Sequence, residues 1–199
     1  MSSRVFQDMV KKATGENTVL ARSKESIDWY RKAARRYKRT IQPEQIEKSV
    51  GSAALKSRIK VGGMYMFQYS AKFAEELPYW DRVPLIIPFN EDKTHFWAIN
   101  FHYAPPIYRA VIMDELYSIT ENPNTTEQQK SVLTWNLLKN MTNSKLIKPL
   151  VHCYLKSRVQ SQFINIETAY WNIALFLPTQ QFQKQSVRKV YSDYQRKVK

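Results

Sequence analysis

Apolar and polar residues alternate along short segments in the middle of the chain, a pattern typical of β-strands. Residues 64–69 (MYMFQY) and 95–103 (HFWAINFHY) alternate in this way, and residues 84–89 (PLIIPF) form a short apolar run bounded by prolines. The polar residues 90–93 (NEDK) favour a turn, so the second and third segments are predicted to form a hairpin. Residues 71–83 are predicted to form a long loop that carries aromatic side chains.

A helical period replaces this alternation after the two prolines at 105–106. Apolar residues recur every three or four positions over 106–118 and 126–141, and Thr125 or Thr126 is suited to begin the second helix. The remaining segments are predicted as a helix over 146–159, a strand over 163–166, a helix over 167–176 and a basic terminal helix or tail over 186–199.

The first 60 residues are predicted to be largely helical. Residues 2–12 suit a short helix, residues 23–39 form a longer one with an apolar stripe, and residues 49–60 resemble a linker or an extended lead-in. The fold class expected from the whole pattern is α+β. It comprises a small antiparallel sheet or SH3-like barrel at about 61–104, a helical second half and basic helical ends.

Composition limits the kind of protein that this chain can be. Its 199 residues are 43% hydrophobic and 13% aromatic, which suits one folded unit rather than a disordered tail. Cys153 is the single cysteine, so no intramolecular disulfide can form. The first ten residues lack the apolar core of a signal peptide, and no apolar stretch approaches the length of a membrane span. We therefore expect a soluble, unsecreted protein with no membrane partner.

The net charge of +14 is concentrated at the two ends of the chain. Residues 1–60 contain 15 Lys and Arg against 6 Asp and Glu, residues 184–199 contain 6 against 1, and residues 61–183 contain 10 of each. The expected domains are therefore a basic helical N-terminal arm (1–60), a neutral core (61–183) and a basic C-terminal helix or tail (184–199). Dense cationic segments of this kind suit phosphates or acidic subunits.

Two basic sets are candidate interaction sites. The first lies on the predicted N-terminal helix and comprises Arg31, Lys32, Arg35, Arg36, Lys38 and Arg39. The second lies at the C-terminus and comprises Lys184, Arg188, Lys189, Arg196, Lys197 and Lys199. A solvated helix face is the alternative interpretation of either set.

A third candidate site is aromatic and comprises Tyr79, Trp80 and Tyr103. Aromatic residues and prolines in a loop provide rigid apolar area, as interaction surfaces require. The alternative interpretation is that Tyr79 and Trp80 fold back to cover the small sheet, and the sequence favours neither.

Catalytic chemistry has weak support in the sequence. His95 and His102 are seven residues apart on one predicted strand, so their side chains should point to opposite faces and cannot share a metal. His152 and Cys153 are neighbours on a predicted helix and should diverge by about 100°. We expect no enzyme activity, no cofactor, no metal and no small-molecule substrate.

One nuclease pattern is nevertheless present. Asp81, followed by Glu91-Asp92-Lys93, matches the bare Asp…Glu-x-Lys arrangement of Mg²⁺-dependent nucleases. That chemistry requires the second carboxylate and the lysine on an interior strand, whereas here they fall in a predicted polar turn.

Three strings resemble small proteins of large contractile-tailed bacteriophages, the myoviruses. These strings run from Met64 to Tyr69, from Leu77 to Leu85 and from Asn100 to Pro106, with a looser match at residues 174–178 and at Phe182. The resemblance covers about residues 61–190 and leaves the basic N-terminal segment unmatched. It implies a phage origin and a role in the virion or its assembly, and it transfers no catalytic residue.

Three functions remain open at this point. The preferred one is a non-enzymatic structural or assembly protein of the virion, in the baseplate, neck or connector region, made in the host cytoplasm and docked on other virion proteins through its basic arms. The alternative is a DNA-binding protein that coats or protects phage DNA ends. The least favoured is the Mg²⁺-dependent nuclease.

Overall fold

A computed structural model of the 199-residue chain describes residues 54–120, 122 and 124–199. Its centre is a six-stranded sheet in the order β1-β7-β2-β4-β5-β6, in which all neighbouring strands are antiparallel. The strands are β1 (Leu55–Lys56), β2 (Met64–Met66), β4 (Leu85–Glu91), β5 (His95–Asn100), β6 (Val151–Leu155) and β7 (Phe163–Ile166). A separate two-stranded sheet joins β3 (Trp80–Asp81) to β8 (Phe182–Gln183).

The helical elements follow the sheet in the sequence or connect its strands. The α-helices are α4 (Pro106–Thr120), α5 (Glu127–Met141), α6 (Trp171–Ala174) and α7 (Val187–Val198). Short 3₁₀ helices are η2 (Phe101–Tyr103), η3 (Lys148–Leu150), η4 (Lys156–Arg158) and η5 (Thr168–Tyr170). The predicted α+β class is confirmed. Every helix in the described part of the chain is too short or too polar to cross a membrane.

The predicted hairpin of the second and third strands is present as β4 and β5, with a register shift between Pro88 and Asn90. The alternative of a barrel is wrong, because the sheet is open, with β1 and β6 at its edges. It also extends beyond residues 61–104, since β1, β6 and β7 complete it.

The predicted helix over 146–159 is wrong. Its segment forms η3, then strand β6, then η4, because residues 151–155 pair with β5 along the sheet edge. The predicted helix over 167–176 is shorter than expected and consists of η5 and α6. The predicted helices over 106–118, 126–141 and 186–199 are confirmed as α4, α5 and α7.

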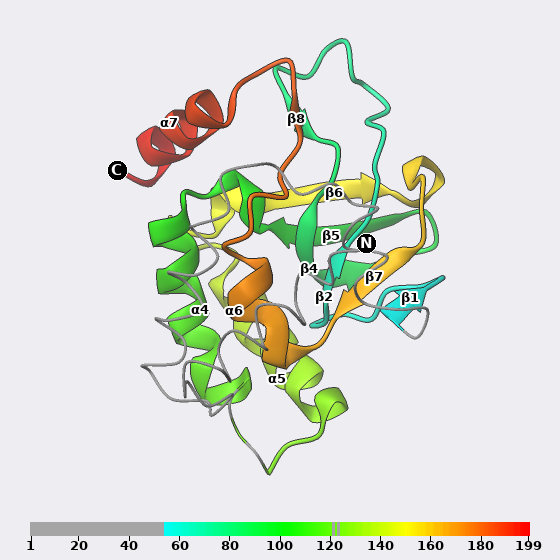
Figure 1. Cartoon of the computed structure of the whole chain (residues 1–199), viewed down its shortest axis with the longest axis vertical. Coiled ribbons are helices and arrows are strands. Elements are labelled where there is room, and N and C mark those ends of the chain that lie inside the picture. The colour runs from blue at the N-terminus through cyan, green and yellow to red at the C-terminus, as the bar shows by residue number, and fades with distance from the viewer. Residues whose placement is uncertain (1–53, 121, 123) are drawn as a thin grey trace, which may run out of the picture.

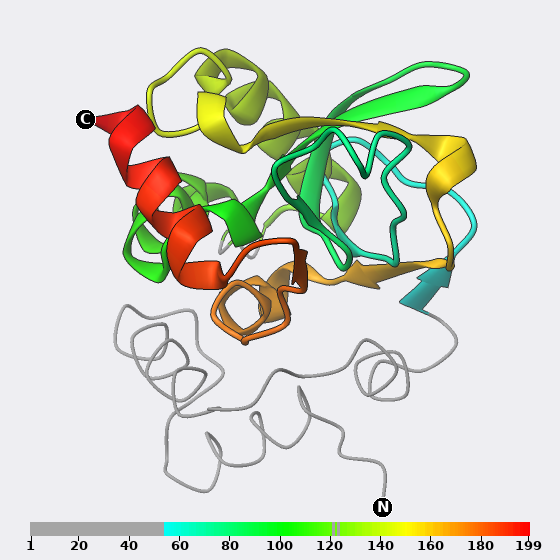
Figure 2. The same cartoon turned by 90° about the horizontal axis from the view of Figure 1, so that it is seen from above.

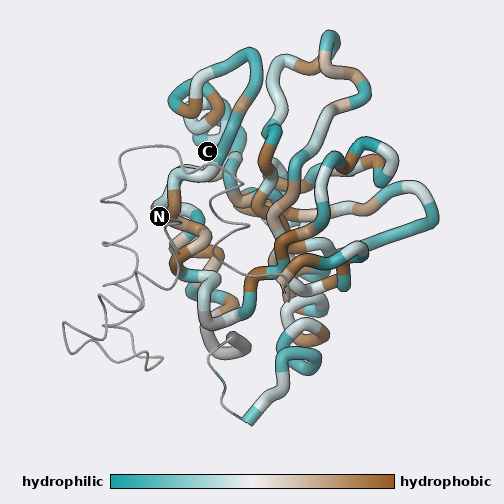
Figure 3. The backbone as a smooth tube through the Cα atoms, turned by 45° about the vertical axis from the view of Figure 1, so that its right-hand side comes forward, coloured by the Kyte–Doolittle hydropathy of each residue, from teal (hydrophilic) through white to brown (hydrophobic). Residues whose placement is uncertain are grey.

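Both faces of the sheet are buried, and their side chains differ. Met64, Met66 and Ile87 face a core that α4, α5, α6 and α7 help to enclose. The helices α4, α5 and α6 lie together on this side of the sheet (Figure 1), and the hydrophobic stretches of the chain gather where sheet and helices meet (Figure 3). The opposite face is aromatic. Its cluster includes Tyr65 and Phe67, which alternate with the methionines as the pleat requires.

Loops cover the aromatic face in place of helices. The connections that contribute to its cluster carry Ile59, Ala71 and Val159, with Trp80 of β3 packed against them. On the helical side, Gly62 has a positive φ of 81° and its amide donates to the carbonyl of Pro88 at 2.7 Å. A Cβ at this position would overlap the carbonyl oxygen of Ser131, so close packing on α5 requires glycine.

Candidate functional site

The basic C-terminal helix α7 is anchored to the core along one side. Ser186 begins the helix, and its side chain accepts a hydrogen bond from the amide of Lys189. Val190 and Tyr194 are buried, and the Tyr194 hydroxyl donates to the carbonyl of Leu146 at 2.8 Å. The structure therefore fixes the orientation of α7, and its remaining side faces solvent.

All six residues of the predicted C-terminal basic set lie on α7 or next to it, but half of them have partners. Lys189 and Arg196 both pair with Asp193 of the same helix. Lys184 lies three residues before α7 and donates to the carbonyl of Glu75 at 2.7 Å, which connects the chain leading into the helix with the 71–81 loop.

The other three cations of the set are Arg188, Lys197 and Lys199. They are exposed and form no ion pair with any residue that the structure describes. These three are the positive charges that α7 can offer to a phosphate or an acidic partner.

A pocket of about 460 Å³ lies between strand β6, the 71–81 loop and the last turn of α7. Figures 1 and 2 show the loop and α7 on the same side of the molecule, beyond the edge strand β6. Eight aromatic rings and two lysines line the pocket: Tyr69, Phe73, Tyr79, Trp80, His95, Tyr103, His152, Tyr154, Lys72 and Lys197.

The structure brings the three predicted aromatic residues together at this pocket. The Tyr103 ring lies 5.9 Å from that of Tyr79 and 5.0 Å from that of Phe182. Trp80 packs instead against the aromatic cluster of the sheet. Tyr79 and Trp80 are half-buried, so they cover the sheet and line the pocket at the same time.

His152 forms part of the pocket wall with an unsatisfied ring nitrogen. Its ring centroid lies 4.1 Å from that of Tyr103. Its Nε2 atom is buried and has no hydrogen-bond partner among the residues that the structure describes. Burial lowers the pKa of His152 to about 4, with Asp81 opposing the shift and Lys197 adding to it. The ring is therefore neutral near pH 7.

A buried polar network lies beneath the pocket and centres on Asp81. One carboxylate oxygen, Oδ2, lies 2.7 Å from His102 Nδ1 and 3.3 Å from the amide nitrogen of the Asn100 side chain. The other, Oδ1, accepts from the amides of Val83 and Gln181. Burial alone would raise the pKa of Asp81, but the facing histidine and these donors lower it.

His102 is fully satisfied within this network. Its Nδ1 faces Asp81, and its Nε2 lies 2.9 Å from the hydroxyl of Thr179. Burial lowers the pKa of His102 although Asp81 opposes the shift, so the neutral ring donates from Nδ1 and accepts from Thr179.

Arg109 ties the network to α7. Its side chain is 1% exposed. It donates to the carbonyls of Ala104 at 2.7 Å and Leu175 at 2.6 Å, and to the Tyr191 hydroxyl at 2.7 Å. Burial lowers the pKa of Arg109, while Asp81 and Tyr191 oppose that shift. Helix α7 is therefore held in place by a hydrogen bond to a buried cation, and this cation also bonds to backbone carbonyls of the core.

This network does not form an active site. Asp81, His102 and Thr179 have the connectivity of a catalytic triad, but His102 is 0% and Thr179 is 1% exposed, so no substrate can reach them. The nuclease pattern is not assembled either, because Asp81 is saturated by the network whereas Glu91 pairs with Lys156 at 2.6 Å. Within the described residues, no group of three or more His, Cys, Asp or Glu could hold a metal ion.

A family model described as the phage T4 terminal DNA protecting protein matches residues 4–197. The chain belongs to this family. The match extends the phage resemblance of residues 61–190 into the basic N-terminal segment and through most of α7. No curated protein and no solved structure matches the chain.

Family membership confirms that this is a phage protein. It does not identify the residues of the functional site, which must be located from the structure. The N-terminal basic set, Arg31, Lys32, Arg35, Arg36, Lys38 and Arg39, lies outside the described residues. The C-terminal set and the aromatic set meet at the pocket, where Lys197 and Tyr79 both contribute to the lining.

Lys72, Phe73 and His152 are among the pocket residues that the sequence analysis did not assign to an interaction site. Lys72 and Phe73 were part of a long loop without a pattern, and His152 was placed on a helix. Alternation along VHCYL could have located His152, because it puts His152 and Tyr154 on one face of a strand.

Proposed function

We propose that this protein binds the ends of phage DNA and protects them. The observation that carries the proposal is the match of almost the whole chain, residues 4–197, to a family described by terminal DNA protection. The match includes both basic ends, which are the segments that suit phosphates.

A protein can protect a DNA end simply by staying bound to it, without catalysing any reaction. A protein seated on a DNA end excludes a nuclease sterically, and affinity for phosphates holds it there. Arg188, Lys197 and Lys199 supply exposed charge on α7, and the N-terminal basic set is predicted to add more. We therefore propose a binding function without catalysis.

An exonuclease protection assay tests the proposal directly. A radiolabelled linear duplex is incubated with the full chain and then with an exonuclease, and covalently closed circular duplex is used as competitor. We expect slower degradation of the linear DNA, and we expect closed circles to compete poorly because they have no ends. Equal competition by circular and linear DNA would show coating without recognition of ends.

The salt dependence of binding tests the contribution of α7. Changing Arg188, Lys197 and Lys199 to Gln removes three positive charges, which should reduce the slope of log affinity against log salt by about 2–3. The matched control changes Lys60, Lys93 and Lys139 to Gln, which removes the same charge elsewhere on the surface. An equal change in both variants would show that α7 has no special role.

The same measurement extends to the N-terminal basic set. Changing Arg31, Arg35, Arg36 and Arg39 to Ala should reduce the salt slope further if this segment contacts phosphates. An unchanged slope would restrict DNA contact to the remaining basic residues.

The family match favours DNA-end protection over a structural role in the baseplate, neck or connector. Association with virion proteins remains a prediction, and mass spectrometry of purified particles tests it. A protein bound to packaged DNA ends would be found there without being part of the tail.

A further inference from the structure

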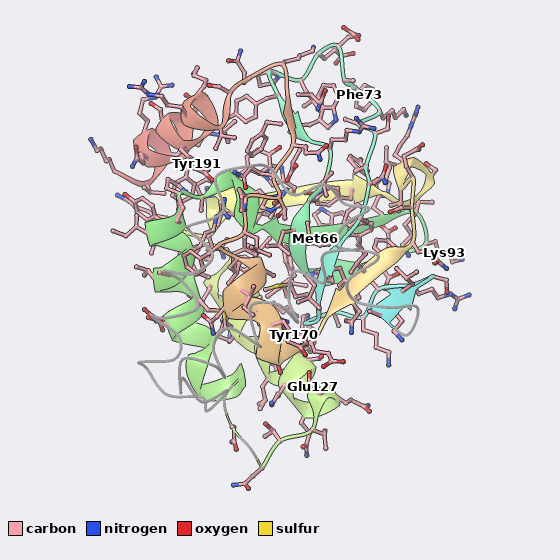
Figure 4. All side chains as sticks on the ribbon, in the orientation of Figure 1. Met66, Phe73, Lys93, Glu127, Tyr170 and Tyr191 are labelled. Atoms are coloured by element: carbon pink, nitrogen blue, oxygen red, sulfur yellow. The ribbon has the colours of Figure 1, made fainter. Side chains whose placement is uncertain are left out.

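The pocket has the size and the walls of a site for a small planar ligand. Its volume of about 460 Å³ falls in the usual range for sites that enclose one small molecule. Phe73 is 53% exposed, and it is the one aromatic side chain in the exposed class among those whose burial the structure describes. Figure 4 shows it on the loop that extends from the top of the molecule, at the same end as Tyr191 of α7. An exposed phenyl ring beside an aromatic pocket is a stacking surface for another ring.

The pocket wall also carries a hydrogen-bonding group that the protein does not use. His152 Nε2 is buried without a partner among the described residues, and such atoms are rare in folded proteins. Because this atom is closed to solvent in the structure, a ligand bonds to it only after the imidazole turns toward the pocket. A neutral imidazole nitrogen can donate or accept according to its tautomer, and the edges of nucleobases present both kinds of group.

Charge at the pocket favours an anion. Lys72 and Lys197 both contribute to the lining, and the Lys72 ammonium lies 5.0 Å from the centre of the Phe73 ring. Asp81 is the acid among the lining residues, and both of its oxygens already accept hydrogen bonds within the buried network. A ligand with an aromatic ring and a phosphate therefore fits the pocket better than a purely apolar one.

We propose that this pocket receives the terminal nucleotide of a DNA strand, with its base on Phe73 and hydrogen-bonded to His152, and its phosphate between Lys72 and Lys197. The proposal rests on the end-binding function and explains how ends are distinguished. A base inside a duplex must be unpaired and unstacked before it can enter a pocket, at a cost of a few kcal/mol. A terminal base has one stacking neighbour fewer, so it enters at lower cost.

A fluorescent base analogue can report entry into the pocket. One linear duplex carries 2-aminopurine at the terminal position, and a second carries it ten base pairs inside. Binding of the full chain should change the fluorescence of the terminal probe and leave that of the internal probe nearly constant. Anisotropy of a dye at the far end measures total DNA binding in the same samples.

Two variants test the contacts. Phe73→Ala should weaken binding to linear DNA by about tenfold and abolish the terminal signal, since stacking of one base is worth about 1–3 kcal/mol. His152→Phe keeps an aromatic ring against Tyr103 but removes the nitrogen, and it should weaken binding by about fivefold. The matched control is Ile107→Ala, which shortens an apolar side chain that is 65% exposed on α4. Circular dichroism establishes that all variants are folded.

The possible outcomes distinguish failure of the pocket assignment from failure of the end-binding function on which it rests. If the terminal signal is lost in Phe73→Ala, binding weakens in His152→Phe, and both signal and affinity are kept in Ile107→Ala, the pocket assignment stands. If linear DNA is preferred over circles but neither variant changes the signal or the affinity, the pocket assignment is wrong and end binding stands. If linear and circular DNA bind equally, the protein does not recognise ends, and both the proposed function and the pocket assignment are wrong. Binding of a peptide in the pocket, with DNA binding unchanged by Phe73→Ala, would also overturn the assignment.

Discussion

Two histidines, the buried His102 and the half-buried His152, differ in how their ring nitrogens are used. His102 has partners on both ring nitrogens, Asp81 and Thr179, and belongs to a closed network. His152 lines a pocket, and its Nε2 has no partner. A polar group is usually buried with its hydrogen bonds satisfied because leaving it unmet costs stability. The difference indicates that His102 is placed for stability, whereas His152 leaves one hydrogen-bonding group unused in the pocket wall.

The same contrast applies to the cations of this region. Arg109 is buried and donates four hydrogen bonds to groups inside the protein, whereas Arg188, Lys197 and Lys199 are exposed without ion pairs among the described residues. The network supports α7, and α7 presents free charge. Changes in the network should therefore act on stability, and changes in the pocket should act on binding.

The largest effect is expected from Arg109→Met. Methionine fills similar volume but leaves the carbonyls of Ala104 and Leu175 without donors and Asp81 without a nearby cation. The free energy of unfolding should fall by about 3–5 kcal/mol, as for other buried charges that lose a partner. Urea unfolding measures this change. Arg82→Met, an exposed control, should change it by less than about 0.5 kcal/mol, and equal effects would contradict the role of the network.

Acid should destabilise the protein through His152 and His102. The pKa of His152 is lowered to about 4 by burial, so between pH 6.5 and 4 the unfolded chain binds a proton that the folded chain does not. Stability is therefore complete above pH 6.5 and falls as the pH drops toward 4, by about 3 kcal/mol for His152 alone. His102 has a lowered pKa and adds to the same fall. Urea unfolding at several pH values measures it, and an unaltered pH profile in His152→Phe would refute the assignment to His152.

A smaller effect is expected from Tyr191→Phe. This change removes the hydroxyl that accepts from Arg109 at 2.7 Å and keeps the ring beside the guanidinium. The loss should be about 1 kcal/mol, the typical net value of one hydrogen bond. Thermal unfolding measures it. A loss as large as that of Arg109→Met would show that the tyrosine ring, and not the hydrogen bond, anchors the helix.

The smallest effect on stability is expected from His152→Phe at neutral pH. The nitrogen that is removed has no partner to lose, and the new ring keeps its contact with Tyr103. The free energy of unfolding should change by less than about 1 kcal/mol. The comparison is His102→Phe, which removes two hydrogen bonds and should be strongly destabilising. Similar losses in the two variants would remove the distinction between the histidines.

Local patterns predicted those parts of the fold that depend on neighbours in sequence. The alternation of residues 84–103 indicated the β4–β5 hairpin, and the helix start near Thr125 or Thr126 is confirmed by a capping box between Thr126 and Gln129. Strand β6 was missed because its conformation is set by pairing with β5, which lies more than fifty residues earlier. In this segment, pairing with β5 outweighs the local preference for a helix.

The candidate site was predictable only in part for the same reason. Tyr79, Tyr103 and Lys197 could be singled out by composition, but their meeting at one pocket follows from β6 at the sheet edge and from Arg109 beneath α7. His152 acquires its position only when β6 is a strand. No local pattern contains that information.

The strand order also constrains the synthesis of this protein on the ribosome. Strands β1, β2, β4 and β5 are made early, but β1 and the free side of β2 need β7, and β5 needs β6. Until residue 155 has emerged, a nascent sheet of β2, β4 and β5 has two unpaired edges and exposes its aromatic face, and its β2 edge stays unpaired until residue 166. Shortened chains that end before β6 should therefore aggregate, and the two halves of the sequence form one cooperative folding unit.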